Sequence, residues 1–304
     1  MIFKNIRIFR LTKPLEHTAE SLHDVLQEHA FVSCDSYQLS SYGWIEPMGK
    51  HGSQLTHQTG RQLMICACKE ERLLPASVLR DTVEEEVDVI ETEQARRVFP
   101  SEKRRLKEEA VQRLLPRAFT KKRLVYGYLD LDNQWLVIES ATAKMAEEFT
   151  QLLRQSLGSL PVVPLICQQE PSSVMTHWLL KQSLPGDYQT GDDCILKDKG
   201  DDKVVLRSKG IDMSSPDYTN YLAGGMQVTK LSLSWQKQID FNLADDLCLT
   251  RIRFNDLIKE QDSGIDVDDF AARFDADLAL MSGSFSELVN SLIEQFGGID
   301  ESIE

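Results

Sequence analysis

The sequence predicts an α+β protein in which helices cover one face of mostly antiparallel sheets. Its 304 residues are enough for about two domains. Runs rich in β-branched and aromatic residues alternate with segments whose apolar residues recur at helical spacing. Two of the strand-like runs, 124–130 and 135–139, are separated by only four residues, which predicts an antiparallel hairpin.

The first elements of the chain alternate between strand and helix. Residues 3–11 predict a strand, and residues 18–29 carry apolar positions along one helical face. A polar loop with several turn residues follows, and residues 62–68 predict a second strand. We expect Trp44 and Met48 of that loop to fill part of the core.

Two consecutive helices come next. Apolar residues about 3.6 positions apart predict a helix over 77–98, with Ser77 as its N-cap. Pro100 interrupts this helix, and Ser101 is placed to cap a second helix that runs to Pro116. Because the first helix alone is about 30 Å long and both are charged on most faces, we expect the pair to project from the body as an arm.

The body resumes with the predicted hairpin and a helix over 144–157, which Gly158 ends. Beyond residue 165 a similar alternation of strands and helices returns, so this half is also expected to be α+β. We expect helices at 177–184, 214–222, 267–280 and 285–296, strands at 203–209, 228–235, 239–243 and 248–254, and an irregular polar segment over 182–203.

Positive charge is concentrated in residues 96–123. Eleven basic and three acidic residues give this stretch a charge of +8, whereas the whole chain carries −14 and the remainder therefore −22. A local positive field on an acidic protein attracts a polyanion to one place, and DNA fits because Lys and Arg near its phosphates release condensed counterions. The alternative is a solvated helix with mixed charges. The basic residues are Arg96, Arg97, Lys103, Arg104, Arg105, Lys107, Arg113, Arg117, Lys121, Lys122 and Arg123.

The composition argues against several classes of protein. No apolar run approaches the ~20 residues of a membrane helix. Charged residues interrupt the apolar N-terminal segment, whereas a signal peptide needs an uninterrupted apolar core. We therefore expect a cytosolic protein whose six cysteines stay reduced, including the isolated pair Cys66 and Cys68. Nucleotide-binding glycine patterns and a nucleophile elbow are absent, so we expect no cofactor, no metal and no catalytic residue.

An acidic cluster keeps a rival function open. Clustered carboxylates bind the Mg²⁺ that assists phosphodiester hydrolysis, so a metal-dependent nuclease using residues 262–277 is one alternative. Acids at a helix start also favour the helix dipole, and Asp275 and Asp277 are expected on different helix faces, which favours capping and solvated surface. A protein-binding module without DNA contact is the other alternative. The clustered residues are Asp262, Asp266, Asp268, Asp269, Asp275 and Asp277.

Segments along the whole chain resemble the bacterial recombination-associated protein RdgC family. They occur in order from one end of the sequence to the other, and the segments over 157–165 and 273–283 are long and specific. The matching segments are FKNIRIFRL, GWIEPMG, ICACKEERLLP, EQARR, LLPRAF, LGSLPVVPL, VTKLSLSWQ and RFDADLALMSG.

The resemblance implies an assembly and a function. Members of the family form a homodimer closed into a ring, and DNA passes through its positively charged hole with little sequence preference and without nucleotide. They are thought to limit the access of RecA to DNA and to act in replication and recombination. The resemblance thus implies a nucleoid-associated, non-enzymatic protein that binds duplex and single-stranded DNA.

The resemblance also implies a division of the chain. It implies a central α+β domain over 1–76 and 119–165, a helical tip over 77–118 inserted into it, and a C-terminal base domain over 166–304. The tips meet at one contact of the ring, where Phe119 matches a gate aromatic. A basic finger adds Lys209 to the eleven basic residues of 96–123 as a DNA-binding residue, although Gly210 stands where a polar residue is expected.

Overall fold

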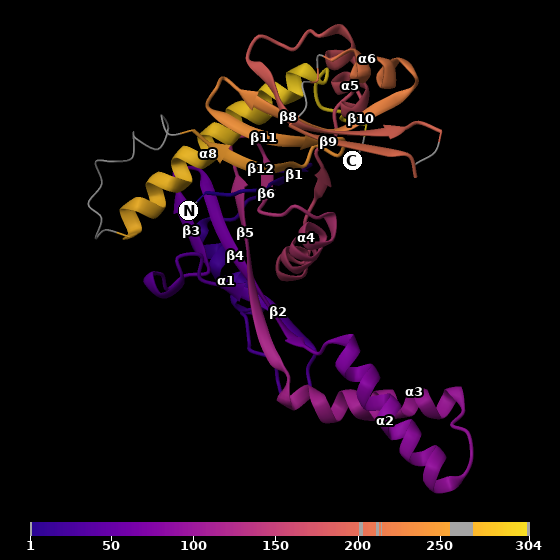
Figure 1. The fold of residues 1–304 in the computed structure, drawn as a ribbon. Helices are drawn as coiled ribbons and strands as arrows, with labels where there is room; N and C mark the ends of the chain where they lie inside the picture. The colour runs from indigo at the N-terminus through magenta and orange to yellow at the C-terminus, as the bar shows by residue number, and fades with distance from the viewer. Residues whose placement is uncertain (1, 201–202, 211–212, 214, 256–269, 303–304) are drawn as a thin grey trace.

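The computed structural model describes residues 2–200, 203–210, 213, 215–255 and 270–302. It contains two antiparallel sheets, several helices and a projecting pair of helices (Figure 1). The predicted α+β class with antiparallel sheets is therefore confirmed.

The first sheet has the strand order β2-β4-β5-β6-β1-β7, with β3 paired to one end of β4. The predicted hairpin is confirmed, because Asp130 at the end of β5 stands opposite Trp135 at the start of β6. The strands are β1 Arg7–Leu11, β2 Ser40–Ile45, β3 Thr56–Thr59, β4 Gln62–Leu73, β5 Phe119–Asp130, β6 Trp135–Ile138 and β7 Val162–Pro164, and the short 3₁₀ helix η1 Gly49–His51 lies between β2 and β3.

Two helices, α1 (Ala19–Gln27) and α4 (Ala143–Leu157), cover one face of this sheet. Thr18 caps α1 by accepting a hydrogen bond from the backbone N–H of Ser21, and Gly158 ends α4 with a φ of +74° that favours glycine. Gly127 allows α4 to approach closely, since a Cβ there would lie 2.8 Å from the Phe149 ring. Local sequence signals therefore set this layer.

The opposite face of the first sheet packs against the C-terminal half. One continuous core joins Tyr128 of β5 to Phe285 of the 26-residue helix α8 (Phe270–Gln295), and the backbone N–H of Phe3 donates to Met281 Sδ. Helices therefore lie on both faces of this sheet, and the expectation of helices on one face is wrong for it. The reason is that the C-terminal half brings its own helix across the second face (Figure 1).

The second sheet has the order β12-β11-β10-β8-β9. Residues 188–198, which were expected to be irregular, form a strand because they pair with β10 and bury Tyr188, Cys194 and Leu196. The two closing helices expected near 280 are instead the single helix α8, since Met281 and Phe285 continue one buried face past Gly283. The remaining elements are β8 Tyr188–Asp198, β9 Val205–Lys209, β10 Met226–Trp235, β11 Ile239–Ala244, β12 Leu249–Phe254, α5 Pro171–Lys181 and α6 Pro216–Ala223.

The projecting arm consists of α2 (Ala76–Gln94) and α3 (Pro100–Leu114), followed by the 3₁₀ turn η2 (Leu115–Arg117). It is inserted between β4 and β5. The N-caps of its helices are Pro75 and Phe99, each two residues before the predicted caps Ser77 and Ser101. Pro100 starts α3 because the first helical position needs no backbone donor.

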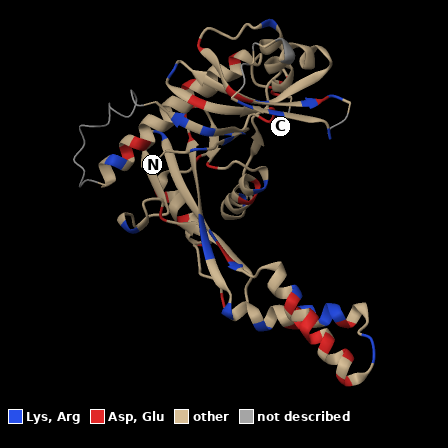
Figure 2. Cartoon of the chain, viewed as in Figure 1, with Lys and Arg blue, Asp and Glu red and all other residues tan. Residues whose placement is uncertain are grey.

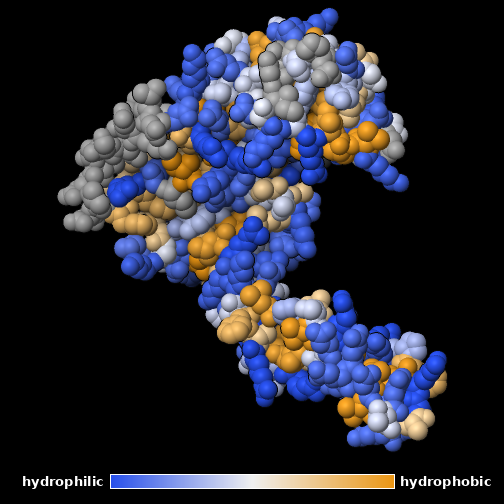
Figure 3. Space-filling model, viewed as in Figure 1, coloured by the Kyte–Doolittle hydropathy of each residue, from blue (hydrophilic) through white to orange (hydrophobic). Residues whose placement is uncertain are grey.

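The molecule is C-shaped. The arm and the β8–β9 end of the second sheet both extend to one side of the body, and α4 lies on the concave side between them (Figure 1). The space-filling view shows the hollow between these two parts (Figure 3). Among the described residues, the helices are too short or too polar to span a lipid bilayer.

Candidate nucleic-acid interface

The predicted basic residues occupy five places in the fold. Arg96 and Arg97 lie in the loop between α2 and α3, and Arg117 lies in η2. Lys209 ends β9 in the second sheet. The other eight are divided between α3, with Lys103, Arg104, Arg105, Lys107 and Arg113, and β5, with Lys121, Lys122 and Arg123, and Arg117 lies between the two groups.

One side of α3 is neutralised by carboxylates. Arg96 forms two hydrogen bonds of 2.8 Å to Glu102, and these lower the pKa of the Glu102 carboxyl below its ordinary value. On the same helix, Arg105 lies 3.5 Å from Glu109. Arg113 pairs with Glu86 of α2. The charges of these three cations are therefore balanced by carboxylates of the protein itself.

The other side of α3 carries cations without such partners. Lys103, Arg104 and Lys107 line a cavity of about 540 Å³ between α2 and α3. Leu79 and Val83 of α2 belong to the same lining. No carboxylate among residues 2–200, 203–210, 213, 215–255 and 270–302 forms an ion pair with these three cations. They are the part of α3 that is available to an anion.

The acidic helix α2 changes the meaning of the basic stretch. Residues 76–94 contain seven acidic residues and one basic residue, and they pack beside α3. Over the whole arm, residues 76–118, ten acidic residues face nine basic ones, so the arm is nearly neutral and two-sided (Figure 2). The charge of +8 applies to residues 96–123 taken alone. In the folded arm, the acidic residues of α2 lie beside them, so the positive field is limited to one side of the arm.

The basic residues of β5 alternate between the two faces of the first sheet. Lys122 stands opposite Glu70 of β4, and its Nζ lies 4.9 Å from the centre of the Phe31 ring. The pKa of Glu70 is lowered, first by the backbone N–H of Cys34 and then by contacts that include Lys122. Lys121 and Arg123 point to the face that α4 covers, where they are free of ion pairs in the described structure.

Phe119 lies where the arm joins the body. It is the first residue of β5, stands opposite Leu73 at the end of β4, and is 83% exposed. The far end of the arm instead presents Phe99, which is 65% exposed. The predicted gate residue is therefore at the root of the arm, because the strand begins two residues after η2 ends.

Lys209 lies in the other projecting part of the molecule. It stands opposite Asp193 of β8, whose carboxylate lies 2.6 Å from Arg251 Nη1. Gly210 follows with a φ of +68°, a backbone conformation that suits glycine better than the polar residue expected there. The arm and Lys209 are thus on separate parts of the protomer.

The acidic cluster is only partly described. Asp262, Asp266, Asp268 and Asp269 lie outside the described residues. Asp275 accepts hydrogen bonds of 2.7 Å from His57 and Thr59 of β3. It is therefore engaged in attaching α8 to the first sheet.

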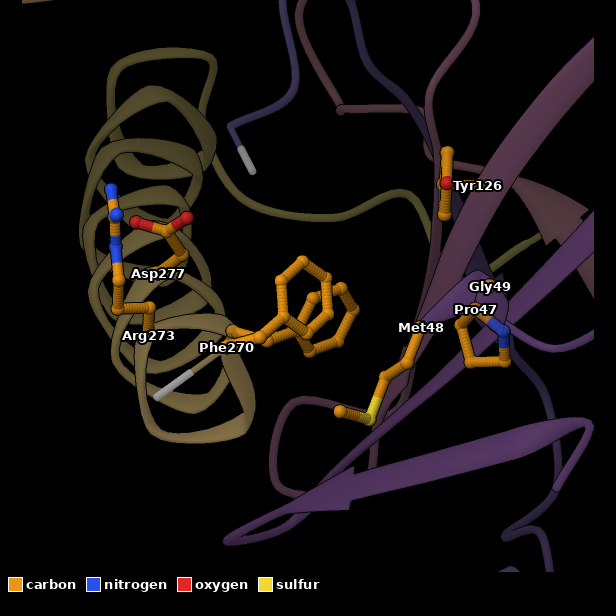
Figure 4. A pocket seen from close by; sticks show the side chains of 8 residues that line it. Pro47, Met48, Gly49, Tyr126, Phe270, Arg273 and Asp277 are labelled. Carbon is orange, nitrogen blue, oxygen red and sulfur yellow. The ribbon is translucent and has the colours of Figure 1, made fainter. Parts of the chain in front are cut away.

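The neighbouring Asp277 points elsewhere. It lines a cavity of about 490 Å³ together with Arg273, Phe270 and Met48, and Figure 4 shows Arg273 and Asp277 beside each other on α8. The expectation of different faces for the two aspartates agrees with these contacts. No three His, Cys, Asp or Glu residues in the described ranges are close enough to hold a metal ion.

Sequence reasoning missed three cations that the structure brings to these surfaces. Arg80 of α2 lines the cavity beside α3, and Lys69 and Lys144 line a further cavity with Arg123. They escaped notice because they lie outside the basic stretch. Arg80 reaches its cavity only because α2 packs against α3, and Lys69 and Lys144 meet Arg123 only through the pairing of β4 with β5 and the position of α4.

The comparisons with known proteins agree with the family resemblance. A family model described as "RdgC: Putative exonuclease, RdgC" matches residues 1–299. The chain belongs to this family. A relative named "Recombination-associated protein RdgC" from Psychromonas ingrahamii is 41% identical over 298 residues, which cover 98% of this chain and 99% of the relative.

Further relatives with the same name support this membership. The protein of Proteus mirabilis is 41% identical over 97% of this chain and 98% of its own length. That of Aeromonas hydrophila is 38% identical over the full length of both chains. The family model is described as a putative exonuclease, whereas the names of these relatives refer to recombination and to no enzymatic activity.

Proposed function

We propose that the protein is a sequence-independent, non-catalytic DNA-binding protein of recombination and replication. It encircles duplex DNA as a ring-shaped homodimer, also binds single-stranded DNA, and limits RecA-mediated recombination at the nucleoid in the cytoplasm. The observation that carries the proposal is the unpaired side of α3, with Lys103, Arg104 and Lys107, on a chain whose net charge is −14. The names of the relatives support the recombination context.

The mechanism follows from the position of the charges. Cations on α3, η2 and β5 contact phosphates, which fixes the protein on the duplex without reading the bases. The acidic remainder repels DNA elsewhere, so binding is confined to the positive side. In the domain division that we propose, residues 77–118 form the tip, and 1–76 with 119–165 and 166–304 form the central and base parts. Exposed Phe119 and a base-to-base contact then close the ring, and Lys209 adds a basic contact from the base.

The proposal is tested by the salt dependence of duplex-DNA binding, measured by fluorescence anisotropy without nucleotide or metal. Replacing Lys103 and Lys107 together with Ala is expected to reduce the log–log salt slope by about 1.8, since each phosphate contact contributes about 0.9. The matched control replaces Arg105 and Arg113 with Ala. It removes the same charge from the same helix, but from cations already paired with Glu109 and Glu86, and is expected to change the slope much less.

Three other outcomes would contradict this proposed function. Absence of binding at low salt would mean that the basic side serves a protein partner or only the fold. Equal effects of the two double variants would mean that net charge, and not the unpaired side of α3, decides the affinity. The DNA is also recovered after incubation with Mg²⁺, and cut DNA that depends on this protein would replace the non-catalytic proposal with a nuclease.

A further inference from the structure

A row of three side chains crosses the first sheet beside α4. Tyr42 of β2 stands opposite Lys69 of β4, and Lys69 stands opposite Arg123 of β5. Paired residues on neighbouring strands point to the same face, so all three lie on the face that α4 covers. Together with Lys144 and Glu148 from the first two turns of α4, they line a cavity of about 200 Å³.

Only one of the cations in this cavity is neutralised. Lys69 Nζ lies 2.8 Å from Glu148 and 3.3 Å from Glu71. Burial alone would lower the pKa of Lys69, but the hydrogen bonds to these two carboxylates raise it above its ordinary value. Both carboxylates of the cavity are thereby engaged by the same cation.

The other two cations of the cavity keep their charge unbalanced. Arg123 and Lys144 have no ion pair in the part of the chain that the structure describes. An anion in the cavity would balance these unpaired charges.

The hydroxyl of Tyr42 is the second sign of a missing ligand. Its Oη atom is buried and has no hydrogen-bond partner among the described residues. Burial, and then the charge of Glu148, raise the pKa of this hydroxyl far above its ordinary value, so it keeps its proton and remains a donor. A buried donor without an acceptor is costly, and an oxyanion in the cavity would supply the acceptor.

The start of α4 adds to a site that the cations and the hydroxyl already define. Its N-cap residue, Thr142, makes no side-chain hydrogen bond to the helix, and the first turn contains no acidic residue. The N-terminal backbone N–H groups of this 15-residue helix therefore remain available to an acceptor.

We propose that this cavity binds a phosphate group through Arg123, Lys144 and the Tyr42 hydroxyl. A guanidinium, an ammonium and a neutral donor around a small space match the several oxygens and the charge of phosphate. The source of the group is either the backbone of bound DNA or free phosphate. The DNA source rests on the proposed function, and α4 lies on the concave side of the molecule, between the arm and the base (Figure 1).

The first experiment measures the cavity without DNA. Inorganic phosphate is titrated by isothermal titration calorimetry at constant ionic strength. Tyr42→Phe and Lys144→Gln are each expected to raise the dissociation constant of phosphate about tenfold, the effect of losing one hydrogen bond to a charged group. Arg154→Gln, which removes an exposed cation from the other end of α4, is the matched control and is expected to leave the constant unchanged.

The melting temperature of Tyr42→Phe provides a second test, because this variant is expected to lose phosphate affinity without losing stability. Without phosphate its melting temperature is expected to equal or exceed that of the wild type, because the variant removes a buried hydroxyl that has no partner. With phosphate it is expected to gain less stability than the wild type. Unchanged phosphate affinity in both Tyr42→Phe and Lys144→Gln, or a lower melting temperature of Tyr42→Phe without phosphate, overturns the inference.

The second experiment identifies the source of the phosphate. If the DNA backbone supplies it, Lys144→Gln lowers the salt slope of duplex binding by about 0.9, and Lys50→Gln on η1 does not. If Lys144→Gln weakens phosphate binding and leaves the slope unchanged, the ligand is free phosphate. A wild-type protein that binds phosphate but no DNA would overturn the proposed function and leave the phosphate site standing.

Discussion

The arm and the body of this protein are held together by cores of very different size. In the arm, Val83, Leu106 and Ala110 are the buried residues between α2 and α3. In the body, one continuous core runs from Phe3 through the second sheet to Phe296, and a separate cluster lies under α1 and α4. The arm therefore has far less apolar burial to hold its helices.

Because of this difference, the residues that stabilise the fold and the unpaired cations of α3 lie largely in different parts of the molecule. The cations of α3 sit on a part of the molecule that contributes little to the core, so charge changes there leave the body intact. The exception is β5, whose first residues carry Lys121, Lys122 and Arg123 and whose last residues, such as Leu129, are fully buried. This strand therefore runs continuously from the root of the arm into the core of the body.

The largest expected effect is in the body. Phe149 is fully buried, meets Trp44 edge-on with ring centres 5.2 Å apart, and fills the space left by Gly127. Phe149→Ala is expected to lower the free energy of unfolding by about 3–5 kcal/mol, measured by urea denaturation. Val78→Ala, on the exposed side of α2, is the control with an expected change near zero. A loss of unfolding free energy below about 1 kcal/mol for Phe149→Ala would mean that the body repacks easily. It would contradict the view that the large core makes the body the more sensitive region.

A smaller and local effect is expected in the arm. Leu106→Ala removes one of the three buried side chains between α2 and α3 and is expected to destabilise their packing by about 2–3 kcal/mol. Amide hydrogen exchange should accelerate in α2 and α3, with the amides of β6 unchanged, because the arm opens without the body. If Leu106→Ala lowers the stability of the whole protein as much as Phe149→Ala does, arm and body form one cooperative unit.

The smallest effect concerns the contact of α8 with β3. Burial alone would raise the pKa of Asp275, but hydrogen bonds from Thr59 and His57 lower it below its ordinary value. A lowered folded-state pKa contributes stability above the ordinary aspartate pKa of about 3.9, and this contribution is lost as the pH falls through the folded-state value. Because the Asp275 side chain is 47% exposed, the contribution is expected to stay below about 1 kcal/mol.

The measurement is the unfolding free energy of Asp275→Asn against that of the wild type between pH 7 and pH 2. The variant should be less stable at pH 7, and the difference should vanish at the acidic end. Asp24→Asn, which replaces an exposed aspartate on α1, is the matched control. A difference that persists at pH 2 would show that Asp275 acts through packing and not through its charge.

Local signals were enough to predict much of the fold. Thr18 and Gly158 set the limits of α1 and α4, and the short link 131–134 set the β5–β6 hairpin, since each depends on neighbours in sequence. The matching segments also predicted the family from one end of the chain to the other. The clustering of basic residues in 96–123 was visible as well, but not which of them are neutralised.

Contacts between distant segments decided the rest. Residues 188–198 became a strand because β10 lies beside them, and α8 crossed Gly283 because both sides of that position are buried against the sheets. Pairing with Glu86 and Glu109 left Arg113 and Arg105 balanced, while Lys103 and Lys107 stayed open. The sequence by itself determined the local elements, the family and the supply of positive charge. Only the tertiary structure decided where that charge is unopposed, because neutralisation depends on distance in space and not along the chain.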